Sequence, residues 1–150
     1  MKLGDISSIL TKMIHSLQRD FDERLISVVI YGSYAKGNAN PTSDIDLLVV
    51  IKDLPRDWDI IHDMERELMR KGRGLGKRFH VTLASPEDVQ DSVECAAPLM
   101  LEIYDAHQIL LDRDGFFEKN MKRMKKLVKE RGIYKIREGV WRVPEGVIPS

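Results

Sequence analysis

Gly32 and Ser33 form the first of two short motifs whose residue types and spacing suit chemistry. They directly follow Ile26–Tyr31, a β-branched, apolar stretch that predicts a buried strand. Because glycine has no side chain, a ligand can approach the backbone closely at this point. If a helical turn begins after Gly32, its free N–H groups and the Ser33 hydroxyl face outward together and form a site for an anion.

Asp44 and Asp46 form the second motif, at the start of the predicted strand 44–51. Residues two apart on a strand point to the same face. Two carboxylates this close repel each other, which raises the pKa of one of them unless a cation neutralises the pair. Their hard oxygen atoms, next to a bound phosphate, are ligands that suit Mg²⁺. Either motif alone is ordinary, a turn or a solvated strand end, but together they predict a nucleotide site.

Hydrophobic periodicity predicts the elements that must position these motifs. Strands are expected at 26–31, 44–51, 78–83 and 109–111, with two further short strands between 134 and 143. Helices are expected at 5–23, 57–71, 86–95, 98–105 and 116–131. Asp5 is expected to cap the first helix, and Ser85 followed by Pro86 is typical of a helix start.

The 150 residues are expected to form one domain, with a core from about 5 to 112 and a basic helix and hairpin from about 116 to 150. The chain has 24 basic and 24 acidic residues, which excludes a uniformly basic nucleic-acid-binding protein. Its single cysteine, Cys95, excludes an internal disulfide framework and is expected to be buried. No apolar run approaches about 18 residues, so no membrane contact is expected and the protein is predicted to be cytoplasmic.

Two segments are locally basic. Arg70–Arg78 holds five basic residues and three glycines and is expected to form a turn, whereas 118–131 has seven basic residues against two acidic ones. Such runs are usually solvated faces, and apolar residues at helical spacing predict that the second run is the exposed side of an amphipathic helix. Nucleic-acid binding by the two segments is the weaker interpretation. Trp58 and Trp141 are expected to be packing residues.

Gly32-Ser33 followed by Ser43-Asp44-Ile45-Asp46-Leu47 resembles the signature of the nucleotidyltransferase superfamily of DNA polymerase beta, in particular its minimal prokaryotic members. The motif match covers about residues 26–51, and the order of strands and helices fits to about residue 83. The resemblance implies an α/β (α+β) fold, with a mixed β-sheet and flanking helices. It also implies an enzyme that uses Mg²⁺ to transfer a nucleoside monophosphate from a nucleoside triphosphate, ATP in the first place, to a hydroxyl acceptor.

The resemblance also implies roles for single residues. The nucleotide-binding residues would be Gly32, Ser33, Lys36 and Ser43. Of these, the first two would hold the β- and γ-phosphates, and the lysine would meet phosphate charge. Asp44 and Asp46 would be catalytic metal ligands, holding the Mg²⁺ ions that stabilise the attacking and leaving oxygens.

The chain departs from the family at the third carboxylate, which the family carries on the next strand. The matching segment here, 78–83, contains no acid. On strand alternation His80 and Thr82 share a face, so one of them stands at the position of the missing group. His80 could serve as the catalytic base, since an unperturbed imidazole titrates near pH 6.5. A purely structural histidine is the equal alternative.

Two functions remain open at this stage. Minimal members of the family often act as the antitoxin of a pair, with an all-helical HEPN-type toxin as partner that some of them adenylylate, and the resemblance implies such a role. The alternative is a degenerate, non-catalytic module that binds a nucleotide or a partner. The missing third carboxylate favours the module, whereas the retained Gly-Ser and Asp-x-Asp motifs favour the enzyme.

Overall fold

The computed structural model describes residues 3–144. Its strands are β1 (Leu25–Tyr31), β2 (Ile45–Ile51), β3 (Phe79–Ala84), β4 (His107–Asp112), β5 (Tyr134–Arg137) and β6 (Val140–Arg142). Its α-helices are α1 (Ser7–Phe21), α2 (Ser33–Lys36), α3 (Trp58–Gly74), α4 (Pro86–Glu94), α5 (Pro98–Asp105) and α6 (Phe116–Glu130). Short 3-10 turns lie at Leu3–Ile6, Asp22–Arg24 and Arg113–Gly115.

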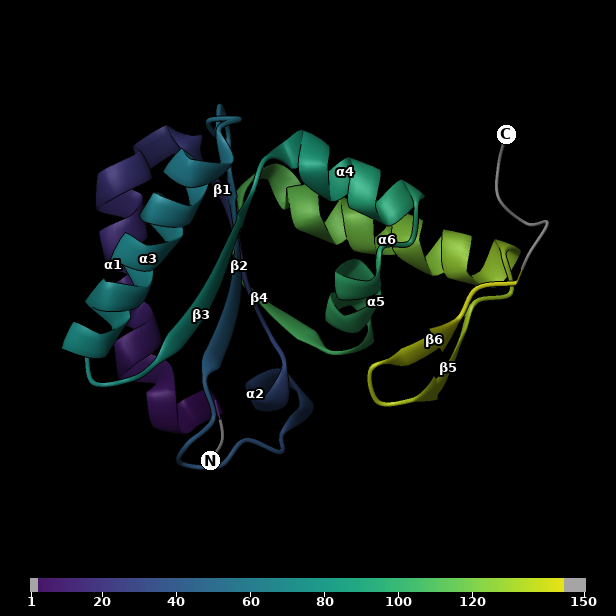
Figure 1. The fold of residues 1–150 in the computed structure, drawn as a ribbon, viewed down its shortest axis with the longest axis horizontal. Coiled ribbons are helices and arrows are strands. Elements are labelled where there is room, and N and C mark those ends of the chain that lie inside the picture. The colour runs from purple at the N-terminus through teal and green to yellow at the C-terminus, as the bar shows by residue number, and fades with distance from the viewer. Residues whose placement is uncertain (1–2, 145–150) are drawn as a thin grey trace.

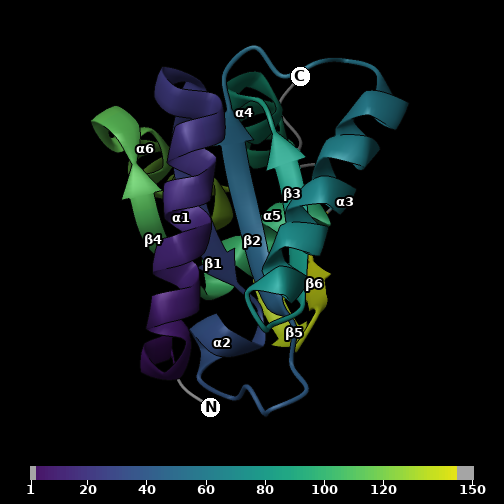
Figure 2. The ribbon, with the colours of Figure 1, turned by 90° about the vertical axis from the view of Figure 1, so that its left-hand side faces the viewer.

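Four strands form one mixed sheet in the order β3-β2-β1-β4 (Figure 2). β1 runs antiparallel to both of its neighbours, whereas β2 and β3 are parallel. The register places Tyr31 opposite Asp46 and Asp46 opposite His80, so three neighbouring strands bring these residues to the same end of the sheet. β5 and β6 form a separate hairpin. The predicted α/β (α+β) class, with a mixed sheet and flanking helices, is confirmed.

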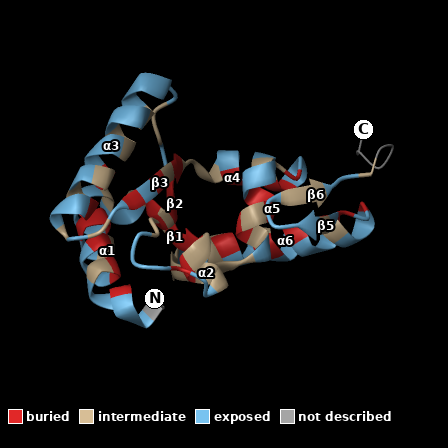
Figure 3. Ribbon diagram, turned by 60° about the horizontal axis from the view of Figure 1, so that its bottom comes forward, coloured by how far each residue is buried: buried red, intermediate tan, exposed pale blue. Residues whose placement is uncertain are grey.

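Helices cover both faces of the sheet (Figure 1). α1 and α3 pack on one face, and α4, α5 and α6 pack on the other. Alternate residues of β1 enter the two separate cores, with Val28 and Ile30 in one and Val29 and Tyr31 in the other. Because both faces are covered, the central strands can be continuous apolar runs. Figure 3 shows the buried residues in the sheet and on the inner faces of the helices.

Local sequence signals account for the starts and faces of two helices. The Ser85 hydroxyl accepts a hydrogen bond from the Asp88 N–H (3.0 Å), and the Asp88 carboxylate accepts one from the Ser85 N–H (3.1 Å), which is a capping box at the predicted start of α4. α6 buries an apolar stripe and leaves its lysines and Arg123 on the outside, as predicted, but Arg131, the last base of the run 118–131, is buried at the C-cap position. The buried residues of α6 are Phe117, Met121, Met124 and Leu127.

Two helix boundaries differ from the prediction. Asp5 does not occupy the capping position of α1, because it lies in the preceding 3-10 turn and Ile6 is the N-cap residue. α3 continues to Gly74, so much of the basic segment predicted as a turn is helical. Gly72 lies so close to Phe79 that a Cβ at this position would collide with the aromatic ring. This glycine therefore serves the packing of α3 on β3 and does not end the helix.

Two predictions about single side chains are wrong. Cys95 is exposed, at the C-cap position of α4. The Trp58 residue is 73% exposed, because burial on α3 falls on Leu68 and Gly72 in the second half of the helix. None of the helices within residues 3–144 is both long enough and apolar enough to cross a membrane.

The contact between α3 and β3 gives a stability prediction. Gly72→Ala should lower the melting temperature, because overpacking against the buried Phe79 ring costs about 1–3 kcal/mol and outweighs the helix-propensity gain of about 1 kcal/mol. Gly74→Ala is the matched control, since a Cβ there meets no atom within 4 Å. Thermal unfolding followed by circular dichroism should show a lower melting temperature for Gly72→Ala and no decrease for Gly74→Ala. Equal melting temperatures would contradict the packing interpretation.

Candidate active site

The turn at Gly32 connects β1 to a single helical turn, α2. Gly32 has a φ of +73°, a conformation that favours glycine, and Gly37 ends the turn with a φ of +78°. The Lys36 N–H donates to the Gly32 carbonyl oxygen (3.0 Å), and the Asn38 N–H donates to the Ser33 carbonyl oxygen (3.0 Å). The helical turn expected after Gly32 therefore forms, with Ser33 as its first residue.

The Gly32 backbone lies directly against the Asp46 carboxylate. A Cβ placed on Gly32 would collide with Oδ2 of Asp46 and would lie 3.1 Å from its Cγ. The reason is the strand register, in which Tyr31, the residue before Gly32, is opposite Asp46. Position 32 therefore requires glycine for two reasons: its positive φ favours glycine, and there is no room for a Cβ beside Asp46. The two motifs of the sequence meet here.

Asp46 is the carboxylate at the centre of the site. Its side chain is 26% exposed, and its Oδ1 lies 3.5 Å from Nδ1 of His80. Burial raises the pKa of Asp46, and the negative charge of Asp44 raises it further, while His80 and Lys36 act in the opposite direction. Additional positive charge near this half-buried carboxylate would favour its ionised form.

Asp44 and Ser43 lie at the edge of this cluster, in the loop that precedes β2. The Asp44 carboxylate accepts a hydrogen bond from Nε of Arg78 (2.9 Å). The Ser43 hydroxyl accepts one from the Asn40 N–H (2.9 Å), which closes the loop on itself. The nucleotide-binding role of Ser43 therefore stays a prediction, and the structure shows a structural role for this hydroxyl.

The ammonium group of Lys36 is held by two carboxylates from distant parts of the chain. It lies 3.4 Å from Oε2 of Glu102 on α5 and 2.8 Å from Oε2 of Glu138 in the turn of the β5-β6 hairpin. The hydrogen bond with Glu138 is the main reason that the pKa of Lys36 is raised. Lys135 and Lys36 lower the pKa of Glu138 to about 2, so this carboxylate is ionised at any pH near neutrality.

Three residues near the site carry no local sequence signal. Glu102 and Glu138 are acids on a helix and a turn, and only the tertiary fold brings them to Lys36. Tyr31 has a buried hydroxyl that makes no well-formed hydrogen bond, although the Thr82 hydroxyl lies beside it. Burial raises the pKa of Tyr31, so the phenol stays protonated. The Tyr31 hydroxyl is therefore an unsatisfied hydrogen-bond donor near Asp46.

His80 and Thr82 share one face of β3, as alternation predicted, while Phe79, Val81 and Leu83 are buried on the other. The His80 side chain is 59% exposed. Since its Nδ1 faces Asp46, Nε2 is the ring nitrogen left to interact with another molecule.

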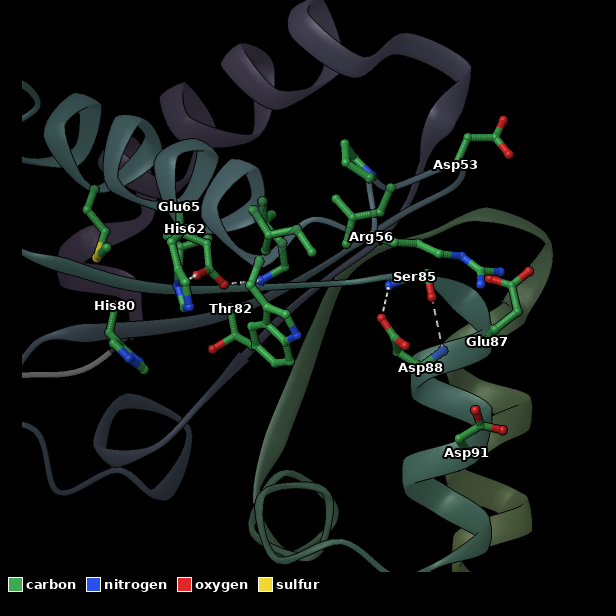
Figure 4. A pocket seen from close by; sticks show the side chains of 17 residues that line it. Asp53, Arg56, His62, Glu65, His80, Thr82, Ser85, Glu87, Asp88 and Asp91 are labelled. Atoms are coloured by element: carbon green, nitrogen blue, oxygen red, sulfur yellow. Dashed lines mark hydrogen bonds and ion pairs between the residues drawn. The ribbon is translucent and has the colours of Figure 1, made fainter.

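A groove of about 1130 Å³ opens beside His80 (Figure 4). We call it the β3 groove. Its floor is the segment 80–83 of β3, one wall is α3 with the loop before it, and the other wall is the start of α4. The polar residues that line it include Asp53, Arg56, His62, Glu65, His80, Thr82, Ser85, Glu87, Asp88 and Asp91.

The donor set at Asp46 suits a hard divalent cation. Within residues 3–144 no group of three or more acidic, histidine or cysteine side chains is arranged to hold a metal by itself. Mg²⁺ is commonly held by one or two carboxylates together with substrate phosphates, so Asp44 and Asp46 beside the Gly32 turn fit that pattern.

Sequence comparisons find a family model and relatives that match this chain. The profile of the nucleotidyltransferase domain matches residues 10–134. "Putative protein adenylyltransferase MJ1305" of Methanocaldococcus jannaschii is 30% identical over 142 residues, which cover 93% of this chain and 95% of that protein. A shorter relative from the same organism, "Putative protein adenylyltransferase MJ0141", is 33% identical over 55 residues, 37% of this chain and 52% of that protein.

Solved structures share the fold at lower identity. A chain of a toxin–antitoxin crystal structure with AMP-PNP has a TM-score of 0.53 and 21% identity, over 81% of this chain and 91% of that one. A chain of the complex of tri-AMPylated Shewanella oneidensis HEPN toxin with the MNT antitoxin has a TM-score of 0.51 and 19% identity, over 84% of this chain and 92% of that one. Spectinomycin adenyltransferase AAD(9) from Enterococcus faecalis, solved with ATP and spectinomycin, has a TM-score of 0.55 and 15% identity, over 82% of this chain and 67% of that one.

The carboxylates around Lys36 give a prediction about its reactivity. Glu138→Gln should lower the pKa of Lys36 towards its ordinary value, because the hydrogen bond that chiefly raises it is weakened, and the free amine should then be acylated faster. Competitive acetylation with mass spectrometry would measure the rate at each lysine. Lys122, which pairs with Glu118 on α6, is the internal reference. An unchanged ratio of Lys36 to Lys122 labelling would show that the hairpin does not hold Lys36 in solution.

Proposed function

Since the chain belongs to the nucleotidyltransferase domain family, we propose that it is a Mg²⁺-dependent enzyme that transfers AMP from ATP to a hydroxyl group of a protein. One observation carries the proposal: the Gly32 backbone lies so close to the Asp46 carboxylate that no Cβ fits between them. A phosphate held at the Gly32–Ser33 turn would therefore lie beside the carboxylates that hold a metal. This is the arrangement that phosphoryl-group chemistry needs.

Asp44 and Asp46 are the residues that would hold Mg²⁺, with phosphate oxygens completing its shell. When bound, the metal supplies charge stabilisation for the attacking and leaving oxygens. Arg78 contacts Oδ1 of Asp44, so this ion pair would compete with the metal for that oxygen. Arg78 is exposed and can turn to solvent at little cost, since exposed pairs contribute little to stability.

Ser33 and Lys36 would hold the triphosphate at α2. Ser33 is the first residue of the turn, and Lys36 is its last. Lys36 would exchange Glu138 for phosphate, which requires the hairpin turn to give way. Glu138 is exposed in that contact, so the exchange replaces one solvated carboxylate with a phosphate of higher charge.

His80 would accept the proton of the attacking hydroxyl at Nε2. The acceptor oxygen forms a bond to the α-phosphorus, the bond from that phosphorus to the bridging oxygen breaks, and pyrophosphate leaves. Because Nδ1 of His80 faces Asp46, the ring is oriented with Nε2 away from the carboxylate. Asp46 would also stabilise the imidazolium that forms, since it lies within 3.5 Å of that ring.

The relatives support ATP as donor and a protein as acceptor. MJ1305 carries the name of a protein adenylyltransferase, and the chain covers nearly its whole length. One solved structure with this fold contains AMP-PNP, and another contains an AMPylated HEPN toxin with its antitoxin. We therefore propose a HEPN-type toxin as partner and an antitoxin role for this chain.

A non-catalytic binding module is the second candidate. The observation that favours it is His80 at the position where the resemblance expects a carboxylate, together with the two carboxylates that occupy Lys36. Such a module would bind a nucleotide or partner without transfer. The two candidates differ in one measurable property, the covalent labelling of an acceptor.

The metal requirement gives the first test. Calorimetric titration should show ATP binding with Mg²⁺ and much weaker binding with EDTA, because triphosphate and carboxylates otherwise repel each other. Asp46→Asn should weaken Mg·ATP binding by about 1–3 kcal/mol, the range for interactions with charged groups. Asp63→Asn, an exposed position on α3, is the control and should bind normally. Equal ATP affinity with Mg²⁺ and EDTA would overturn the proposed site.

Transfer itself is tested with nucleotides labelled at the α-phosphate. Wild-type protein, Mg²⁺ and host lysate should yield a labelled protein acceptor with ATP in preference to GTP, CTP or UTP. His80→Ala should then lose about 10²- to 10⁴-fold in rate, the usual contribution of a general base, with Mg·ATP binding retained. If the wild type binds Mg·ATP but labels no acceptor, the module is correct. In that case His80→Asp, which restores a third carboxylate, should raise Mg²⁺ affinity.

A further inference from the structure

The order of the strands assigns different sides of the site to the two substrates. The Gly32 turn follows β1, Asp46 lies on β2 and His80 lies on β3. In phosphoryl transfer the attacking and leaving oxygens are roughly in line on opposite sides of phosphorus. With the triphosphate on the β1 side of Asp46, the acceptor must arrive from the β3 side. The β3 groove is the cavity that opens there (Figure 4).

The groove exposes the edge of the sheet. β3 is an outer strand, and the Arg78 carbonyl oxygen accepts a hydrogen bond from the Ile45 N–H of β2. By the alternation of a parallel ladder, the backbone groups of Phe79, Val81 and Leu83 then face away from β2. Glu65 accepts a hydrogen bond from the Leu83 N–H (2.9 Å) and protects that part of the edge. Within residues 3–144 no strand pairs with the rest of this edge, which can accept an added strand.

The walls of the groove are acidic. Of the described residues that line it, five are carboxylates and one, Arg56, is an arginine or lysine. The side chains of Glu87 and Asp91, on the wall formed by α4, make no ion pair or hydrogen bond with another side chain of residues 3–144. Carboxylates without a counter-charge repel a triphosphate and attract cations. The groove is therefore unsuited to the nucleotide and suited to a basic molecule.

An aromatic side chain stands at the mouth of the groove. Trp58 is 73% exposed, and its ring centroid lies 5.7 Å from that of His62. Its position lines the groove, where a lysine or arginine of a bound partner could stack on its face. Exposed tryptophans are unusual on a free surface and are enriched among residues that dominate binding energy.

We propose that the β3 groove binds a basic, extended segment of the acceptor polypeptide and presents a hydroxyl of that segment to His80. The inference rests on the proposed function and adds the chemistry of the substrate. The groove, at about 1130 Å³, is larger than most small-molecule sites, and the open edge of β3 matches a peptide backbone. The acidic walls select a segment rich in lysine or arginine.

The test uses the full chain and two short synthetic peptides. Both carry a central tyrosine, flanked by lysines in one peptide and by glutamates in the other, and fluorescence anisotropy measures their affinities in the presence of a non-hydrolysable ATP analogue and Mg²⁺. The basic peptide should bind about tenfold tighter or more, because charge complementarity across an interface can supply that difference. Its affinity should fall as ionic strength rises.

Matched variants locate the binding. Glu87→Lys combined with Asp91→Lys should weaken the basic peptide about tenfold or more and leave Mg·ATP binding unchanged. Glu118→Lys combined with Glu130→Lys alters net charge equally on α6, outside the groove, and should have little effect. Trp58→Ala should also weaken binding of the basic peptide, although it changes no charge. Tyr134→Ala, at another exposed aromatic residue, is its control and should leave peptide binding unchanged.

Three outcomes would overturn the inference. Equal affinity for the basic and acidic peptides, or equal loss in the two double variants, would show that the groove does not select charge. A basic peptide with N-methylated backbone that binds as well as the unmodified one, and is displaced by spermidine, would show a site for small cations. Each outcome leaves the proposed function standing as long as Mg·ATP binding depends on Asp46, and loss of that dependence would overturn the proposed function alone.

Discussion

The close approach of the Gly32 backbone to the Asp46 carboxylate is the contact on which the candidate site depends. It brings a turn suited to phosphate and a carboxylate suited to metal within van der Waals distance, and any side chain at position 32 would separate them. The approach is fixed by the pairing of β1 with β2, whose buried residues lock the register on both faces of the sheet. A slip of one residue would turn Asp46 to the opposite face, so the two cores that stabilise the fold also set the chemistry.

Charge is distributed differently on the two sides of Asp46. On the β1 side, Lys36 is held between Glu102 and Glu138, so this cation is neutralised by carboxylates of its own chain. On the β3 side, the groove has an excess of carboxylates. Under the proposed function, Lys36 would meet the anionic nucleotide only after it leaves Glu138, whereas the carboxylates of the groove would attract a basic partner. The β5-β6 hairpin contributes to the first side through Glu138, although it belongs to a separate two-stranded sheet.

His80 shows how one strand pairing decides the character of the site. The parallel register of β2 and β3 puts His80, one of the two residues that could replace the third carboxylate, beside Asp46. A third negative charge there would add to the repulsion between Asp44 and Asp46, whereas the imidazole favours the ionised form of Asp46. Compared with a third carboxylate, His80 attracts a cation less strongly, but it provides a basic nitrogen. The buried Tyr31 phenol beside Thr82 adds a hydrogen-bond donor on the same face.

The amino-acid sequence by itself determined the class of fold, the order of the main elements and the two motifs, because these depend on local periodicity and on residue types a few positions apart. The capping box at Ser85 and the alternation on β3 are of this kind. Only the tertiary structure decided the partners of Lys36, which lie far along the chain, and the true extent of α3, where packing against Phe79 explains a glycine that reads as a helix end. It also decided the exposure of Trp58 and Cys95, since burial depends on which elements cover a residue. The β3 groove belongs to the same group: its floor and walls come from three elements, and no local pattern states that they meet around an open strand edge.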